Sequence, residues 1–168
     1  SATSNQPFFI WYAPWLPHLP HDPPMEYLPS DSEITIPSTI SEADRPAFIA
    51  ESRKFYGMVR WLDDKVGEVL QRLATAGKLD NTVVIYMVDN GYSYGYISKG
   101  SPYEKGLRSP IIIHDPRRQP LQATFNQTIS TLDLPATILD YAGLPIPATY
   151  AGQSLRSLLE SKNLLQHP

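Results

Sequence analysis

The sequence predicts an α/β fold in which helices sandwich a mixed, mostly parallel sheet. Short apolar stretches rich in β-branched and aromatic residues alternate with amphipathic stretches at helical spacing. The apolar stretches are nearly continuous, which is typical of strands covered on both faces. The 168 residues are enough for one domain with a hydrophobic core.

The first predicted strand is the aromatic segment at residues 8–13, between Pro7 and Pro14. Its composition indicates that it is buried. Residues 14–37 follow with seven prolines and two histidines, so regular backbone pairing is not expected there. A loop of this length in a compact domain, with clustered histidines and aromatics, favours a functional role.

A long helix is predicted to begin at Asp44, which can cap it, with Pro46 in the first turn and Gly77 at the end. Apolar residues at helical spacing form a stripe along it, which we interpret as core packing. The stripe comprises Phe48, Phe55, Val59, Leu62, Val66, Val69 and Leu73. Asp63 and Asp64 lie beside the stripe and are expected on a solvated face rather than as a metal pair.

Four further elements complete the prediction. They are strands at residues 82–88 and 110–114, a helix at residues 130–142 and a short helix at residues 155–159. Gly143 ends the longer of these helices. A glycine-rich loop at residues 91–106 joins the two strands.

Composition excludes several classes of function. The net charge of −3 gives no basic field, so no nucleic-acid partner is expected. The absence of cysteine excludes disulfides, thiolate metal sites and a cysteine nucleophile from these residues. No stretch approaches the roughly 20 apolar residues of a membrane span. The first residues resemble no signal peptide and lead almost directly into the apolar segment at residue 8.

Asp89 and Asn90 follow the most apolar predicted strand, at the edge where α/β sheets bind ligands. A carboxylate and an amide supply oxygen ligands suited to Ca²⁺ or Mg²⁺ rather than zinc. Gly91 lets the backbone turn away at once. The alternative is ordinary turn chemistry, because Asp-Asn-Gly is also a common turn sequence.

Lys99 lies just beyond this pair, in the glycine-rich loop. A lysine ammonium is suited to holding a sulfate or phosphate oxygen and the charge that develops on it. Glu104 and Arg108 are four residues apart and are predicted to pair with each other, bracing the loop. Lys105 is expected to be a solvated surface charge.

His18 lies shortly after the first predicted strand, with prolines on both sides that limit the chain entropy lost in fixing its ring. A histidine beside a leaving-group oxygen can donate a hydrogen bond or a proton. The alternative is a loop histidine packed on Trp15.

Taken together and in order, these segments resemble the sulfatase family of the alkaline-phosphatase-like superfamily. The matching segments are residues 8–14 (FFIWYAP), 17–20 (PHLP), 56–67 (YGMVRWLDDKVG), 84–91 (VIYMVDNG), 99–110 (KGSPYEKGLRSP), 131–143 (TLDLPATILDYAG) and 151–155 (AGQSL). The resemblance implies an alkaline-phosphatase-like fold that is incomplete, with residues 1–168 forming a single partial domain. Lys105 stands where the family usually has glycine.

The resemblance implies a role for each candidate residue. Asp89 and Asn90 would ligate Ca²⁺, with Mg²⁺ as the alternative; Lys99 would contact the sulfate; His18 would lie near the leaving oxygen. The implied activity is hydrolysis of a sulfated small molecule or sulfated carbohydrate. The implied compartment is extracytoplasmic, meaning periplasmic, lysosomal or secreted, and the sequon at Asn126 is a faint hint of secretion.

The family's formylglycine nucleophile arises from a Cys/Ser-x-Pro/Ala-x-Arg motif that precedes these segments, together with two further aspartate ligands. We therefore expect both to come from a missing amino-terminal part, which is also a candidate partner. The isolated chain is accordingly expected to hydrolyse little. Residues 41–45 (SEADR) fit the bare motif, but they follow His18, bring two acids toward an anionic ester and suit a helix start.

Two alternatives stay open. One is a phosphodiesterase or phosphonate hydrolase of the same superfamily, although related phosphatases typically show Asp-His where this chain has Asp89-Asn90. The other is a binding or scaffold module that kept the fold without catalysis. It predicts that replacing Lys99 or His18 leaves the physiological activity unchanged.

Overall fold

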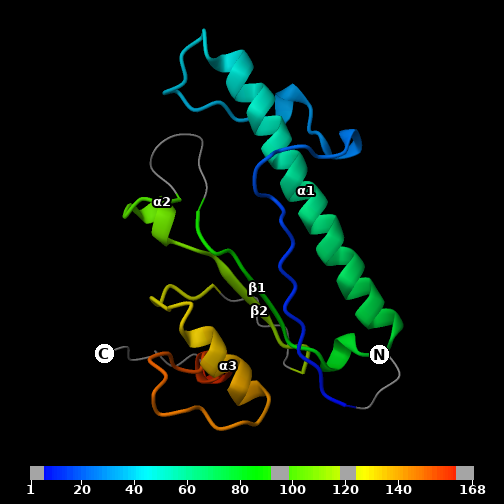
Figure 1. The fold of residues 1–168 in the computed structure, drawn as a ribbon, viewed down its shortest axis with the longest axis vertical. Helices are drawn as coiled ribbons and strands as arrows, with labels where there is room; N and C mark the ends of the chain where they lie inside the picture. The colour runs from blue at the N-terminus through cyan, green and yellow to red at the C-terminus, as the bar shows by residue number, and fades with distance from the viewer. Residues whose placement is uncertain (1–5, 92–98, 118–123, 162–168) are drawn as a thin grey trace. The chain divides into compact units, whose positions relative to one another are not determined.

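The longest element is α1, Arg45–Thr75, which Figure 1 shows as a single continuous helix. Pro46 lies in its first turn and Gly77, with a φ of 63°, follows its end, as predicted. Asp44 occupies the capping position, but its side chain caps nothing. That part of the prediction is wrong, because the Asp44 carboxylate accepts a hydrogen bond from the Ser41 hydroxyl at 2.6 Å instead.

The computed structural model describes residues 6–91, 99–117 and 124–161, without the side chain of Lys105. Its contacts divide the chain into two compact units, residues 1–120 and 121–168. That the two belong to one domain stays a prediction.

In the first unit, the proline-rich loop covers part of α1. The loop forms two 3-10 turns, η1 (Met25–Tyr27) and η2 (Asp31–Glu33), and both contact the helix. The Tyr27 ring stacks on the Trp61 ring, with the two ring centres 6.2 Å apart. The Tyr27 hydroxyl donates a hydrogen bond to the Asp64 carboxylate at 2.7 Å. Arg53 Nε donates to the carbonyl of Pro29 at 2.7 Å. These contacts anchor the loop that carries His18.

The apolar stripe of α1 is covered unevenly. Phe48 is buried, as predicted, together with Met58, which lies outside the predicted stripe. Val59 is 40% exposed and does not pack in a core. The fully buried side chains of the helix thus lie in its first half, whereas the stripe residues of its second half, Leu62, Val66, Val69 and Leu73, are half-buried.

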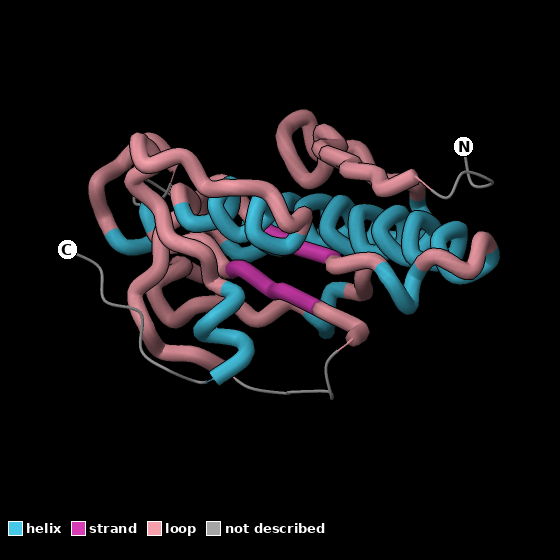
Figure 2. The backbone as a smooth tube through the Cα atoms, turned by 90° about the horizontal axis from the view of Figure 1, so that it is seen from below, coloured by secondary structure: helices cyan, strands magenta, loops and turns pink. Residues whose placement is uncertain are grey.

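The described sheet has two strands, β1 (Val84–Met87) and β2 (Ile111–His114), seen side by side in Figures 1 and 2. A third 3-10 turn, η3 (Leu79–Asn81), precedes β1. The strands pair antiparallel, with Val84 opposite His114. The α/β class is confirmed, but this pair is not parallel. The described residues of the connection, 88–91 and 99–110, form one short helix, α2 (Glu104–Leu107), and an antiparallel pair needs no crossover helix.

The predicted buried strand at residues 8–13 is wrong for the described structure. These residues form no strand, and Figure 1 shows them as an extended trace. Phe9 is 66% and Trp11 72% exposed. The described sheet contains only β1 and β2, so no described strand pairs with this segment or covers its aromatic side chains.

The second unit contains α3 (Asp133–Tyr141) and α4 (Arg156–Ser161), close to the two predicted helices. Its core includes Leu134, Ala136, Leu155 and Leu158, all buried. The fully buried Asp133 carboxylate accepts hydrogen bonds from the backbone N–H groups of Ser130 and Gln153, both at 2.8 Å. These bonds fix the loops that flank α3.

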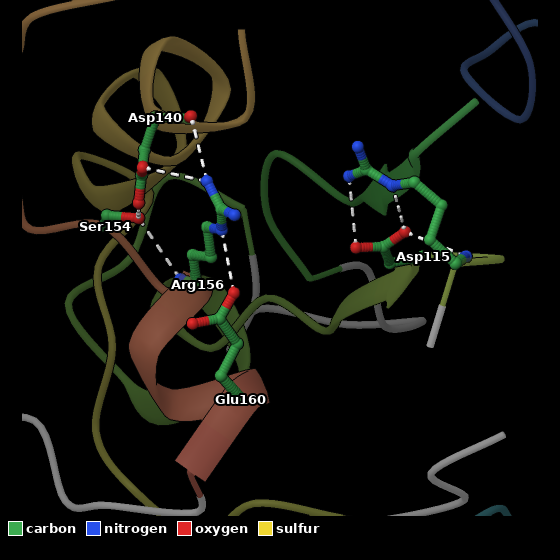
Figure 3. Close-up of polar contacts among 6 residues, drawn as sticks. Asp115, Asp140, Ser154, Arg156 and Glu160 are labelled. Atoms are coloured by element: carbon green, nitrogen blue, oxygen red, sulfur yellow. Dashed lines mark hydrogen bonds and ion pairs between the residues drawn. The ribbon is translucent and has the colours of Figure 1, made fainter. Parts of the chain in front are cut away.

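A polar network joins α3 to α4 in the second unit (Figure 3). The Arg156 guanidinium donates to Glu160 at 2.8 Å and to the Asp140 carboxylate at 3.3 Å. Ser154 donates to the same carboxylate at 2.5 Å, and the guanidinium lies 5.5 Å from the centre of the Tyr141 ring. The network is half-exposed, so it orients the two helices more than it stabilises them.

Candidate active site

His18 and Lys99 meet in the first unit. Lys99 Nζ lies 3.4 Å from His18 Nε2, at the long end of hydrogen-bonding distance. His18 is positioned by a tight turn, in which its backbone N–H donates to the carbonyl of Trp15 at 2.8 Å. Both side chains are exposed, so the pair is accessible to a ligand.

The two ring nitrogens of His18 face partners of opposite kinds. Nδ1 lies 2.9 Å from the carbonyl oxygen of Leu19, which can only accept a hydrogen bond. Nε2 faces the Lys99 ammonium, which can only donate. The arrangement is therefore satisfied by a neutral imidazole that carries its proton on Nδ1 and presents the Nε2 lone pair.

Trp15 is held by the same carbonyl. Its indole N–H donates to the Leu19 oxygen at 3.0 Å, and its ring centre lies 4.7 Å from that of His18. The ring of His18 thus packs on Trp15, as the alternative predicted, and also contacts Lys99; its place beside a leaving oxygen stays a prediction. The sequence indicated Trp15 only as a packing partner; its spacing before His18 gave no sign that one oxygen anchors both rings.

Asp89 and Asn90 follow β1 after Val88, whose backbone N–H donates to the carbonyl of Pro110 at 3.3 Å. Asp89 Oδ1 accepts the backbone N–H of Asn90 at 2.8 Å, and the Asn90 amide nitrogen donates to the carbonyl of Gly91 at 3.2 Å. Asp89 Oδ2 and the Asn90 amide oxygen make no bond among the described contacts. These contacts also do not connect the pair to His18 or Lys99.

The chemistry of Asp89 and Asn90 fits a hard cation. A carboxylate and an amide oxygen are ligands for Ca²⁺, which takes about six to eight oxygens. The pair can supply only part of such a set, and no group of three or more His, Cys, Asp or Glu side chains suited to a metal occurs among the described residues. Any complete sphere needs further oxygens beside these two.

Two other features of the sequence have structural explanations. Arg108 donates to Glu104 at 2.8 Å, which confirms the predicted pair that braces α2. In the SEADR segment, the Ser41 hydroxyl is bound to Asp44, and Arg45 pairs with Glu42 at 2.9 Å. This segment is a helix start, as its sequence indicated. The side chain of Lys105 lies outside the described residues.

Solved structures place the chain in the alkaline-phosphatase-like fold. A protein crystallised with a neocarrahexaose superposes with a TM-score of 0.67 at 24% identity, covering 88% of this chain and 32% of that one. A phosphonate monoester hydrolase from Silicibacter pomeroyi superposes with a TM-score of 0.61 at 26% identity, covering 78% and 26%. The predicted alkaline-phosphatase-like fold is therefore confirmed.

The family follows from sequence. The sulfatase family model matches residues 1–144, so the chain belongs to the sulfatase family. An arylsulfatase of Clostridium perfringens is 28% identical over 186 residues, covering 95% of this chain and 39% of the relative. An N-acetylglucosamine-6-O-sulfatase of Bacteroides thetaiotaomicron is 32% identical over 113 residues, covering 66% and 20%. The chain thus spans less than half the length of these relatives.

Proposed function

We propose that this chain forms the sulfate-binding and leaving-group side of a sulfatase active site, in a protein that hydrolyses sulfate esters. Membership of the sulfatase family supports the reaction class. The contact between Lys99 Nζ and His18 Nε2 is the observation that carries the assignment of residues, because it brings a cation and a proton carrier together from remote segments.

Lys99 binds the sulfate group. Its ammonium donates to the neutral His18 nitrogen at 3.4 Å, a long bond that a charged sulfate oxygen can replace with a shorter and stronger one. As the ester bond breaks, negative charge grows on the sulfate and leaving oxygens, and a fixed ammonium stabilises that charge most. Transfer of Lys99 to the substrate also frees His18 Nε2.

His18 serves the departing alcohol. The bond from Nδ1 to the Leu19 carbonyl keeps the ring in one orientation, so Nε2 stays directed at the site. Once Lys99 has moved to the sulfate, Nε2 can take up a proton from water, and the resulting imidazolium donates it to the leaving oxygen as the bond to sulfur breaks. The Nδ1 bond persists throughout, because Nδ1 carries a proton in both states of the ring.

Asp89 and Asn90 would hold the cation, Ca²⁺ with Mg²⁺ as the alternative. The bound cation would supply positive charge toward the sulfate oxygens. The formylglycine nucleophile is assigned to no residue of this chain. The chain has no cysteine, and the Ser41 hydroxyl is bound to the Asp44 carboxylate, which does not fit that role.

We propose a sulfated carbohydrate as substrate and an extracytoplasmic location. Relatives from Bacteroides thetaiotaomicron and Homo sapiens are named for sulfated N-acetylglucosamine. Relatives from Drosophila melanogaster and Caenorhabditis elegans are named as extracellular sulfatases. No helix in the described part of the chain is both long and apolar enough to cross a membrane.

The test is sulfate release by the intact protein that contains this chain, with calcium and after chelation. Lys99→Ala should abolish most of the activity. Lys54→Ala is the matched control, because Lys54 is an exposed lysine paired with Glu51 on α1. Full activity in Lys99→Ala would instead support a module without catalysis through this site.

A second candidate is phosphonate or phosphate diester hydrolysis, favoured by the likeness to the phosphonate monoester hydrolase of Silicibacter pomeroyi. The two candidates differ in ester and metal. Rates with matched nitrophenyl esters of sulfate and of phenylphosphonate, each with calcium or with manganese, separate them. Faster phosphonate hydrolysis with manganese would replace the sulfatase assignment.

A further inference from the structure

We propose that Trp15 is the stacking platform for the sugar ring of the substrate, and that it selects pyranoside sulfates over sulfate esters without a ring. The inference rests on the proposed function. It adds a residue that selects the substrate by the group attached to the leaving oxygen.

The indole of Trp15 is exposed and fixed at the same time. The residue is 70% exposed, yet its N–H is bound to the Leu19 carbonyl at 3.0 Å. That bond satisfies the only polar group of the side chain. The surface that remains is an aromatic face, held in place before any ligand arrives, so little side-chain entropy is lost on binding.

The position of Trp15 places this face on the leaving-group side. Its ring centre lies 4.7 Å from that of His18, while Lys99 contacts Nε2 of the same imidazole. In the proposed mechanism Lys99 holds the sulfate and His18 serves the leaving oxygen. A group attached to that oxygen therefore extends past His18, and Trp15 adjoins His18 through the shared turn.

The chemistry of the face indicates a pyranose. An aromatic ring has a negative face, and the C–H bonds on one side of a pyranose ring form a flat, positively polarised surface that can stack on it. Hydroxyl groups around the sugar rim stay in water because the platform is exposed. A small alkyl group offers too little surface for such a contact.

The experiment compares two substrates with the intact protein that contains this chain: N-acetylglucosamine 6-sulfate, which has a ring, and ethyl sulfate, which has none. Trp15→Ala should lower the ratio of their kcat/KM values roughly three- to tenfold, through KM for the sugar. Trp15→Phe keeps an aromatic face but loses the N–H, and should retain most of the ratio. Trp11→Ala is the matched control, because Trp11 is 72% exposed on the preceding segment.

The outcomes separate the two proposals. An equal loss on both substrates, or a Trp15→Phe variant as impaired as Trp15→Ala, means that Trp15 only positions His18, and the platform is overturned. An unchanged ratio in Trp15→Ala overturns it as well, while sulfatase function stands. If the native protein hydrolyses neither ester, the proposed function fails and the platform fails with it.

Discussion

His18 Nε2 lies 3.4 Å from Lys99 Nζ, although 81 positions separate the two residues in the chain. The contact is between a ring nitrogen and an ammonium, and in the proposed function an anion that binds Lys99 would replace it. Leu19 holds the imidazole from the other side at 2.9 Å. If the pair binds substrate as proposed, these contacts organise it in advance, which lowers the cost of binding.

Replacing Lys99 with methionine should lower kcat for sulfate esters by about 100- to 1,000-fold, because a fixed charge that stabilises the transition state is lost. Methionine keeps much of the length of the side chain without its charge. Steady-state kinetics on the intact protein check this. A rise in KM with kcat unchanged would show that Lys99 only binds the ground state.

His18→Asn should reveal the role of the imidazole through the leaving group. Loss of a proton donor costs roughly 100-fold or more for an alkyl or sugar sulfate, whose alcohol leaves poorly without a proton. A nitrophenyl sulfate, with a stable leaving anion, should lose much less. Equal losses across such a series would contradict the assignment of His18 to the leaving oxygen.

Two glycines of α1 provide a matched pair for the docking of the proline-rich loop. A Cβ on Gly57 would meet Pro23 Cγ at 2.7 Å, whereas one on Gly67 would meet nothing within 4 Å. Gly67→Ala should therefore stabilise the helix by up to about 1 kcal/mol, the usual difference between the two residues. Gly57→Ala should destabilise the chain, because Pro23 and the loop behind it must shift.

Urea unfolding of the two variants measures this difference. The loop that Pro23 belongs to carries His18, so Gly57→Ala should also weaken sulfate ester hydrolysis while Gly67→Ala does not. Equal stability of the two variants would show that the loop does not pack on the helix as described.

Asp133 is expected to be a major determinant of stability in the second unit. Asp133→Ala leaves the part-buried N–H groups of Ser130 and Gln153 without their acceptor, and an unsatisfied donor costs about 1–3 kcal/mol when it is buried. The free energy of unfolding should fall by about 3 kcal/mol in urea titrations. The exposed Asp63 on α1 is the control. Asp63→Ala should change the free energy of unfolding by less than about 0.5 kcal/mol.

The first unit should lose stability in mild acid through His21. Burial lowers the pKa of His21 below its ordinary 6.5; Glu51 opposes this shift, and His18 and Lys54 add to it. The unfolded chain therefore binds the proton more readily than the folded chain. The contribution of His21 to the free energy of unfolding is complete at pH values above 6.5, and it is lost as the pH falls from 6.5 toward the lower pKa of the folded chain. The imidazole packs against Phe55, with ring centres 5.4 Å apart.

Urea midpoints at about pH 7.5 and about pH 5.5 test this prediction, with His21→Gln as the variant that removes the titration. The midpoint of the native chain should fall more between the two values than that of the variant. A separate loss is expected at lower pH, because the backbone N–H of Ser30, followed by Arg60, lowers the pKa of Glu33 below its usual 4.5. If the urea midpoints of the native chain and of His21→Gln fell equally between the two pH values, His21 would not be the group that causes the loss of stability.

The sequence determined the elements whose causes are local. The apolar spacing and flanking residues of α1 and α3 placed both helices, and the four-residue separation of Glu104 and Arg108 predicted their ion pair. The ordered motifs also indicated the family. Each of these inferences depends on residues a few positions apart, where helix geometry and side-chain length decide what can meet.

Only the tertiary structure decided which distant groups meet and which surfaces are covered. The contact of His18 with Lys99, the anchoring of two rings on one Leu19 oxygen and the antiparallel pairing of β1 with β2 all depend on the path of the chain between them. The exposure of residues 8–13 has the same origin, since an apolar segment is buried only where another element covers it. Hydrophobicity sets the tendency to be buried, and the arrangement of neighbouring segments determines whether burial occurs.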